Sequence, residues 1–350
     1  MQLDFSKNIN IESLFPENEF EEKVISFLED WFSHSETVSV QTSGSTGIPK
    51  VFEIEKKRML NSAKMTCDFL GLKEGDTALL CLPVQYISGK MMLVRAIERK
   101  LKVIISVPSS APEISENLEF CAMTPLQVQN SLDKIHFIKN LIIGGVAVSE
   151  KLKNEIFTTL QFSNSPTRIY ETYGMSETLS HIALKQVFPV QEDYFTIFND
   201  VEISVDERNC LKIFAPNLNS EILQTNDIVE LLNEKQFKFL GRFDNVINSG
   251  GVKIFAEELE SLVKKHIDRD LVFLGKPDET LGEKLVLVIE DSSTPLSMTE
   301  IKSQISNLKF PSKFHIPKEV LFLEKFPRAE NGKVLRKELL KIIFDTPSKS

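Results

Sequence analysis

Residues 42–50 read Thr-Ser-Gly-Ser-Thr-Gly-Ile-Pro-Lys, a run in which hydroxyl side chains alternate with glycine and a cation closes the series. Glycine tolerates positive φ, so successive backbone N–H groups can turn toward a single anion. The hydroxyls are additional donors, and the final lysine contributes a positive charge for phosphate oxygens. The run therefore predicts a polyphosphate site whose ligands are Thr42, Ser43, Gly44, Ser45, Thr46, Gly47 and Lys50.

This run differs from the common phosphate loop. A Walker A motif has four residues between its last two glycines and then Lys followed by Ser or Thr. Here two residues separate Gly44 from Gly47, and Pro49 disfavours helical backbone at the residue before it. The alternative is a flexible Ser/Thr/Gly linker. Because the run contains no acid and leads into a β-type stretch at 51–54, phosphate binding is the favoured interpretation.

The composition bounds the class of protein. The 350 residues carry a net charge of −9, which argues against a nucleic-acid binder, and the length allows a large domain plus a small one. No apolar run approaches the ~18 residues of a membrane span, and the N-terminus lacks the features of a signal peptide. Four scattered cysteines suit reduced core thiols. We therefore expect a cytoplasmic protein with no membrane span and no nucleic-acid partner.

Apolar strands alternate with helices over the first half of the chain, which predicts an α/β fold with a mostly parallel sheet covered on both faces. The expected helices are 18–32, 56–70, 90–100, 125–135 and 149–160, and the expected strands are 77–82, 101–107, 140–143 and 167–170. Beyond residue 194, short runs between turns predict an antiparallel β-region at 201–205, 210–214, 228–232 and 236–240.

Glycine-punctuated sequence from Gly241 onward predicts a domain boundary. Residues 1–241 would form a large N-terminal lobe, and residues 242–350 a small mobile α+β lid. The lid is expected to contain helices at 256–266 and 299–308 and strands at 271–274, 284–290 and 319–323.

A second candidate motif, Tyr173-Gly-Met-Ser-Glu-Thr178, follows the expected strand 167–170. Ligands of parallel sheets gather at the carboxyl ends of the strands. Glu177 could hold a hard cation, Thr178 could donate to a phosphate, and Tyr173 offers a flat face for a purine. The alternative is a polar loop capped by Ser176.

Three further features each have an ordinary explanation when taken alone. Gly144-Gly145 could leave bare backbone for a flat base, or could form a plain strand-to-helix turn. Asp227 could bind ribose hydroxyls or serve a turn. Lys333 projects from a turn at Asn331-Gly332, which could be a simple hairpin.

Taken together, the order of these motifs resembles that of the acyl-adenylate-forming enzymes. The same order includes Gly-Arg-x-Asp at 241–244, Gly-Gly-x-Lys-Ile at 250–254 and Pro-Arg-x-x-Asn-Gly-Lys at 327–333, and it spans residues 38–340. That family comprises acyl-CoA synthetases, the adenylation domains of peptide synthetases and the luciferases. The resemblance implies a ligase that uses ATP, Mg²⁺ and coenzyme A to join a small carboxylic acid to a thiol through an acyl-adenylate.

The resemblance also implies a role for each motif residue. The ATP β- and γ-phosphates would be held by Ser43, Gly44, Ser45, Thr46 and Lys50. The adenine would be bordered by Gly144, Gly145 and Tyr173, with Gly174 beside them. Glu177 would hold Mg²⁺, Thr178 would lie near the α-phosphate, and the ribose would be bound by Asp227 and Arg242. Asp244 would be the hinge between the lobes, and Lys333 on the lid would drive adenylation.

The chain departs from the family pattern in three places. Only residues 1–41 precede the phosphate loop, where family members carry a whole subdomain, so we expect a minimal version or one that relies on a partner. Asn226 replaces the usual glycine before Asp227. Tyr86 replaces a histidine in the segment that lines the acyl pocket of the family. The expected pocket residues are Tyr86, Ser88, Gly89 and Lys90.

The short chain and the segment 83–92 look similar to o-succinylbenzoate–CoA ligases of menaquinone synthesis. That substrate has two carboxylates, and Lys90 or Arg95 could pair with the one that is not activated, or could face solvent. One alternative is another aryl or fatty acid–CoA ligase, or an adenylation enzyme that loads a carrier protein. Another is a non-catalytic adenylate-binding scaffold. His181, just beyond Thr178, is expected to be a packed neutral imidazole.

Overall fold

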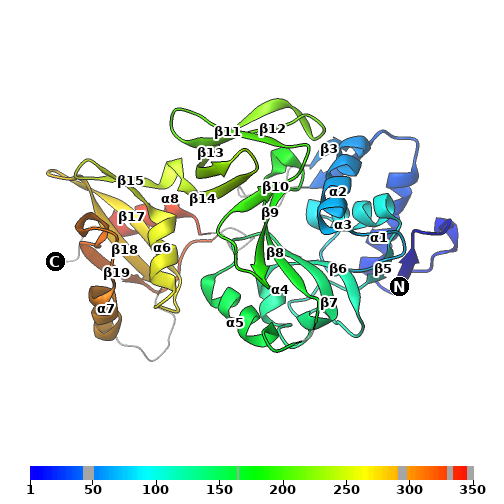
Figure 1. Ribbon diagram of the computed structural model, residues 1–350, viewed down its shortest axis with the longest axis horizontal. Helices are drawn as coiled ribbons and strands as arrows, with labels where there is room; N and C mark the ends of the chain where they lie inside the picture. The colour runs from blue at the N-terminus through cyan, green and yellow to red at the C-terminus, as the bar shows by residue number, and fades with distance from the viewer. Residues whose placement is uncertain (42–50, 164, 291–297, 329–333, 345–350) are drawn as a thin grey trace.

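The structure is a computed structural model that describes residues 1–41, 51–163, 165–290, 298–328 and 334–344. Its strands form a large sheet, a smaller sheet and a two-stranded hairpin (Figure 1). The first helices are α1 (Glu19–Phe32), α2 (Lys56–Leu70), α3 (Ile87–Arg99), α4 (Pro125–Gln129) and α5 (Glu150–Leu160). The later helices are α6 (Ala256–Lys264), α7 (Met298–Asn307) and α8 (Arg336–Phe344).

One half of the large sheet is parallel, as expected from the alternation of strands and helices. Its strands lie in the order β5 (Lys102–Ile105), β4 (Thr77–Leu80), β6 (Leu118–Met123), β7 (Ile138–Ile143) and β8 (Arg168–Gly174). β1 (Gln2–Asp4) pairs antiparallel with β5 at the edge. Alternate side chains of each strand face opposite layers, so Leu80 packs with α1, α2 and α3, whereas Leu79 packs with α4 and α5.

The expected antiparallel region continues the same sheet beyond β8. The strands follow in the order β9 (His181–Phe188), β10 (Phe195–Ile197), β14 (Gln236–Arg242), β13 (Asn219–Asn233), β12 (Cys210–Ala215) and β11 (Glu202–Val205). The register of β13 on β14 places Asp227 opposite Arg242. The carboxyl end of β8 is therefore joined, through β9 and β10, to the strands that carry the predicted ribose ligands.

A separate hairpin flanks the predicted phosphate loop. β2 (Thr37–Gln41) and β3 (Val51–Glu55) are antiparallel, and their register pairs Gln41 with Val51. The loop itself, residues 42–50, lies outside the described residues. α2 begins directly after β3, and Gly71, the residue that follows it, has a φ of +68°, the left-handed conformation that glycine supplies at a helix C-terminus.

The smaller sheet belongs to the C-terminal part of the chain. Its strands are β16 (Val252–Phe255), β15 (Val246–Ser249), β18 (Gly282–Glu290) and β17 (Leu271–Asp278), with β19 (Glu319–Leu323) parallel to β18. Residues of α6 and α7 form one hydrophobic layer with this sheet, and α8 packs on the other side. This is the α+β content expected of the lid, while the boundary at residue 241 stays a prediction.

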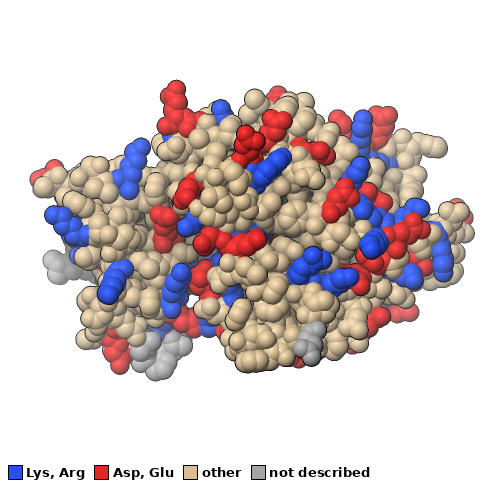
Figure 2. All heavy atoms as spheres, in the orientation of Figure 1, with Lys and Arg blue, Asp and Glu red and all other residues tan. Residues whose placement is uncertain are grey.

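Among the described residues, ion pairs join α5 to the segment that follows α6. Lys151 Nζ of α5 lies 2.6 Å from Asp268 Oδ2, and Lys265 Nζ lies 3.8 Å from Glu150 Oε2. On the face shown in Figure 2, Lys and Arg side chains are interspersed with Asp and Glu. Within the part of the chain that the structure describes, no helix is both long and apolar enough to cross a membrane.

The structure differs from the sequence expectations in the length of one helix and in strands that were not expected. The helix expected over 125–135 ends at Gln129, because the chain turns there and the Ser131 carbonyl accepts from the Lys134 and Ile135 amides at 2.9 and 3.1 Å. This turn buries Ile135 and feeds the chain into β7. Strand β6 was not expected, because Leu118-Glu-Phe-Cys-Ala-Met123 is short and contains residues with no strong strand preference.

Candidate active site

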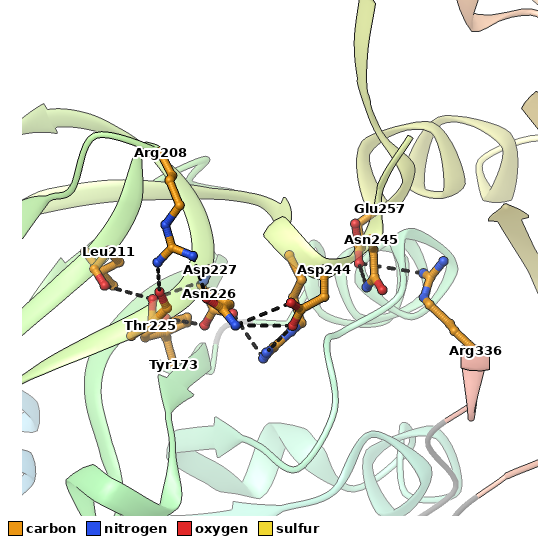
Figure 3. A network of polar contacts seen from close by, with 11 residues as sticks. Tyr173, Arg208, Leu211, Thr225, Asn226, Asp227, Asp244, Asn245, Glu257 and Arg336 are labelled. Carbon is orange, nitrogen blue, oxygen red and sulfur yellow. Dashed lines mark hydrogen bonds and ion pairs between the residues drawn. The ribbon is translucent and has the colours of Figure 1, made fainter. Parts of the chain in front are cut away.

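Three segments that are distant in the sequence meet at Asp227. The Tyr173 hydroxyl, from β8, donates to Asp227 Oδ2 at 2.6 Å, and Arg242 Nη1, from the end of β14, donates to Asp227 Oδ1 at 3.3 Å (Figure 3). Each carboxylate oxygen therefore has one partner. The structure thus brings together the residue predicted to border adenine and the two residues predicted to bind ribose.

The surroundings of Asp227 fix its orientation. The carboxylate residue is only 8% exposed, and its amide donates to Thr225 Oγ1 at 3.0 Å, while that hydroxyl donates to the Leu211 carbonyl at 2.8 Å. The Tyr173 ring meets Phe237 edge-on, with centroids 4.9 Å apart. Burial, reinforced by the Asp227 charge, raises the pKa of the Tyr173 phenol far above its usual range. Tyr173 therefore stays protonated and remains a donor.

The predicted hinge residue, Asp244, joins this cluster. Arg242 Nη2 donates to Asp244 Oδ2 at 3.2 Å, and Asn226 Nδ2 lies 3.3 Å from the same oxygen. Arg208 Nη1 donates in turn to Asn226 Oδ1 at 3.1 Å, and its guanidinium lies 4.8 Å from the Phe243 ring centroid. The asparagine that departs from the family pattern is thus bonded to the predicted hinge. Sequence reasoning missed Arg208, since nothing near it in the chain points to this contact.

The network continues into the C-terminal part of the chain (Figure 3). Asn245 Nδ2 donates to Glu257 Oε1 at 2.5 Å, and Arg336 Nη2 lies 3.7 Å from the same oxygen. Arg336 also donates to Glu260 Oε2 at 2.6 Å. The start of α8 is therefore tied to α6 directly after the segment that carries Lys333.

The predicted adenine-bordering glycines lie at the carboxyl end of β7. β7 pairs with β8 up to Ile143 opposite Glu171, so Gly144 follows beside the strand that carries Tyr173. A Cβ on Gly144 would lie 2.8 Å from Thr172 Oγ1, and Gly145 has a φ of +96°. A Cβ on Gly174 would lie 2.5 Å from the His181 Cα. These glycines allow close backbone approach, and contact with a base stays a prediction.

The Glu177 carboxylate has no partner among the described residues, whereas the Thr178 hydroxyl has backbone partners. Glu177 is exposed, and its carboxylate makes no hydrogen bond or ion pair with the described residues. Mg²⁺ at nucleotide sites is usually held by one or two carboxylates plus substrate phosphates, so a single free carboxylate fits. Thr178 is buried, and its hydroxyl accepts from the Met175 amide at 3.0 Å and lies 2.7 Å from the Ser180 carbonyl. A phosphate contact by Thr178 stays a prediction.

The predicted acyl-pocket residues stand at the start of α3. Tyr86 forms a parallel bridge with Gln41, so this segment lies beside the entry to the phosphate loop. Gly89 packs closely against the backbone of Pro83, because a Cβ at Gly89 would lie 2.3 Å from the Pro83 carbonyl oxygen. Ser88 is exposed. Whether these residues line an acyl pocket stays a prediction.

Lys90 and Arg95, the two side chains that could pair with a second carboxylate of the substrate, lie in different environments. Lys90 donates to the Ser39 carbonyl and lies 5.4 Å from the Phe27 ring centroid, on the side of α1 and β2. Arg95 is 2% exposed and donates to Ser180 Oγ at 2.8 Å. The alternative that Arg95 faces solvent is therefore wrong. Lys50 and Lys333 lie outside the described residues, so their convergence with Glu177 stays a prediction.

His181 has the packed state expected from the sequence. It is buried, its Nε2 lies 3.0 Å from Thr66 Oγ1, and its ring meets Phe198 edge-on. Burial, with a further contribution from the Arg95 charge, holds its pKa well below the ordinary value. The imidazole is therefore neutral in the folded protein.

We expect this histidine to make the folded state lose stability below about pH 6.5, because only the unfolded chain then takes up its proton. The loss grows by up to about 1.4 kcal/mol for each pH unit below that value. Denaturant titrations between pH 8 and pH 5 measure it, and His181→Gln should flatten the slope relative to wild type. His34→Gln, at an exposed position, is the control. Parallel curves for wild type and His181→Gln would contradict the neutral assignment.

Comparison with known proteins adds four findings. Residues 37–197 match the model of the AMP-binding enzyme family. An acyl-CoA synthetase (AMP-forming)/AMP-acid ligase II-like protein from Dyadobacter fermentans is 31% identical, with a TM-score of 0.65 over 98% of this chain and 99% of that one. The 2-succinylbenzoate–CoA ligase of Lactococcus lactis is 23% identical over 96% of this chain and 81% of its own length. The ligase of the same name from Listeria monocytogenes is 26% identical over 89% and 71%.

A further solved structure shares the fold at lower identity. The O-succinylbenzoate coenzyme A synthetase of Bacillus subtilis, in complex with ATP and magnesium ion, superimposes with a TM-score of 0.69 at 21% identity. The match covers 86% of this chain and 69% of that one. That structure therefore shares the fold of this chain over most of its length.

Proposed function

The chain belongs to the family of AMP-binding enzymes that includes the AMP-forming acyl-CoA synthetases, and on that premise we propose that it is a 2-succinylbenzoate–CoA ligase. One observation carries the choice of acid. The curated relatives from Lactococcus, Listeria and Staphylococcus bear this name and align over 85% or more of the chain. The segment around Tyr86 resembles the same ligases.

The reaction has two steps at one site. In the first, a carboxylate oxygen of the acid bonds to the α-phosphorus of ATP while the bond to pyrophosphate breaks. In the second, the thiol sulfur of coenzyme A bonds to the acyl carbon, the bond to AMP breaks, and the thiol proton is released. Both steps bring anions together, so cations and donors matter more than a general base. Lys50 and Lys333 are the cations that we assign to the first step.

The described residues position the nucleotide. We assign Asp227 to the ribose hydroxyls, with Tyr173 and Arg242 holding its two oxygens, and Gly144-Gly145 to the adenine edge. Glu177 would hold Mg²⁺, which neutralises phosphate charge when bound. Asp244 is assigned to the hinge on which the lid turns between the steps. Because ATP and coenzyme A are its co-substrates, we place the enzyme in the cytoplasm. Because 2-succinylbenzoate is the proposed acid, we place it in menaquinone biosynthesis.

ATP–pyrophosphate exchange across a panel of acids tests the proposal. We expect 2-succinylbenzoate to support exchange, and coenzyme A alone to convert the adenylate into a thioester. Exchange with benzoate, fatty or other aryl acids but not with 2-succinylbenzoate would overturn the substrate. Thioester formation only on a carrier protein would overturn the acceptor. Absence of exchange with every acid, together with ATP binding, would favour a non-catalytic scaffold.

A further inference from the structure

The backbone directly after Glu177 and Thr178 is held in a rare conformation. Leu179 has φ +65° and ψ −44°, and the Ser180 amide donates to the Thr178 carbonyl at 2.7 Å. These values describe a γ-turn with a positive-φ centre, which is uncommon and strained for a residue with a branched side chain. Such strain persists only where the surrounding structure imposes it.

Four restraints act on this turn. The Leu179 side chain is buried at 4% exposure. Thr178 Oγ1 lies 2.7 Å from the Ser180 carbonyl, which ties the two ends of the turn together. Ser180 Oγ lies 3.3 Å from His181 Nδ1. From the opposite side, Arg95 Nη2 donates to Ser180 Oγ at 2.8 Å.

Arg95 reaches Ser180 from an environment that disfavours a cation. It lies within the buried run Met91–Ala96 of α3, and its guanidinium forms no ion pair with the described residues. Its Nε is buried without a hydrogen-bond partner, and Nη1 lies 3.9 Å from the Met92 sulfur. Cys67 of α2 and the neutral imidazole of His181 at the start of β9 lie near it. A desolvated cation without a counter-ion destabilises a fold.

The strained turn at Leu179 and the buried cation of Arg95 thus lie side by side. Both adjoin the motif assigned to Mg²⁺ and the α-phosphate. We propose that Arg95 is a positioning residue of the adenylation step, which pins the strained turn at Leu179 and so fixes where Glu177 and Thr178 meet the nucleotide. This inference rests on the proposed function. The fold gains no stability from the buried cation itself, whereas the reaction gains a rigid segment beneath the triphosphate.

Three variants test the role. Arg95→Met removes the charge and the donor at similar volume, and Arg95→Lys keeps the charge without the guanidinium geometry. Arg99→Met, on the same helix but paired with Asp68, is the matched control. We expect Arg95→Met to keep or raise Tm while kcat for ATP–pyrophosphate exchange falls at least tenfold with little change in the KM for ATP. Arg95→Lys should recover part of kcat, and Arg99→Met should leave kcat unchanged.

Hydrogen–deuterium exchange supplies a readout that needs no substrate. The amides of residues 176–180 should exchange faster in Arg95→Met than in wild type, with α2 and β9 unchanged. Unaltered exchange there, or a Tm that falls while kcat per folded molecule is retained, would overturn the proposal and leave Arg95 a structural residue. If wild type uses another acid, the proposed substrate fails, and the Arg95 variants are then assayed with the acid that does support exchange.

Discussion

Replacing Lys333 with alanine should abolish adenylate formation while largely sparing thioester formation from supplied acyl-AMP. The first step brings a carboxylate to a triphosphate, and the resemblance places this lysine between them. Removing one preorganised charge or donor from a developing anion typically lowers kcat by about 10²–10³-fold. ATP–pyrophosphate exchange measures the first step, and release of AMP from synthetic acyl-AMP and coenzyme A measures the second.

The residues on either side of Lys333 explain why its loss should be so specific. Arg328 is hydrogen-bonded to Asp270 at 2.7 Å, and Arg336 is hydrogen-bonded to Glu260 at 2.6 Å, so both flanks are held by residues packed around the smaller sheet. Removing the Lys333 ammonium should leave those anchors intact. Lys337→Ala, an exposed change on α8, is the control and should leave both steps unchanged. Equal loss of both half-reactions in Lys333→Ala would refute the assigned role.

Local sequence signals predicted most of the helices and the parallel strands. α2 and α5 were expected almost to the residue, because each has a clear apolar stripe and, for α5, the capping side chain of Ser149, which accepts from the Leu152 amide at 3.1 Å. The two halves of the large sheet were also expected, but not that they form one sheet. Pairing of β8 with β9 depends on contacts between strands, and periodicity along one strand carries no information about its neighbour.

The candidate active site shows the same limit, because contacts between distant segments cannot be predicted from local sequence. The order of motifs predicted that Tyr173, Asp227 and Arg242 belong to one ligand, and the structure brings them within hydrogen-bond distance. The strained turn at Leu179 could not be predicted, because leucine rarely adopts positive φ and no local signal marks it. Arg95 had a usable signal: it is the one charged residue in the apolar run Met91–Ala96. Its neighbour Ser180, however, is distant in sequence.

Asp227→Ala should lower kcat/KM for ATP by about 100-fold, equivalent to about 2.7 kcal/mol, mainly through KM. The substitution removes the assigned ribose acceptor, deprives the half-buried Tyr173 hydroxyl of its acceptor and leaves Arg242 with Asp244 as its partner. Titration of ATP affinity by calorimetry, in the absence of acid, isolates this effect from chemistry. Asp200→Ala, at an exposed position, is the control for loss of one negative charge.

A second variant separates ribose binding from the support that Asp227 gives to its neighbours. Tyr173→Phe removes one of the donors to Asp227 but keeps the ring that packs on Phe237. If Asp227 acts on the ribose, Tyr173→Phe should weaken ATP binding far less than Asp227→Ala, because the carboxylate remains and is still paired with Arg242. If the two variants lose ATP affinity equally, the carboxylate only holds Tyr173 in place and the ribose assignment is wrong. Unchanged ATP affinity in Asp227→Ala would show that the nucleotide does not bind at this part of the structure.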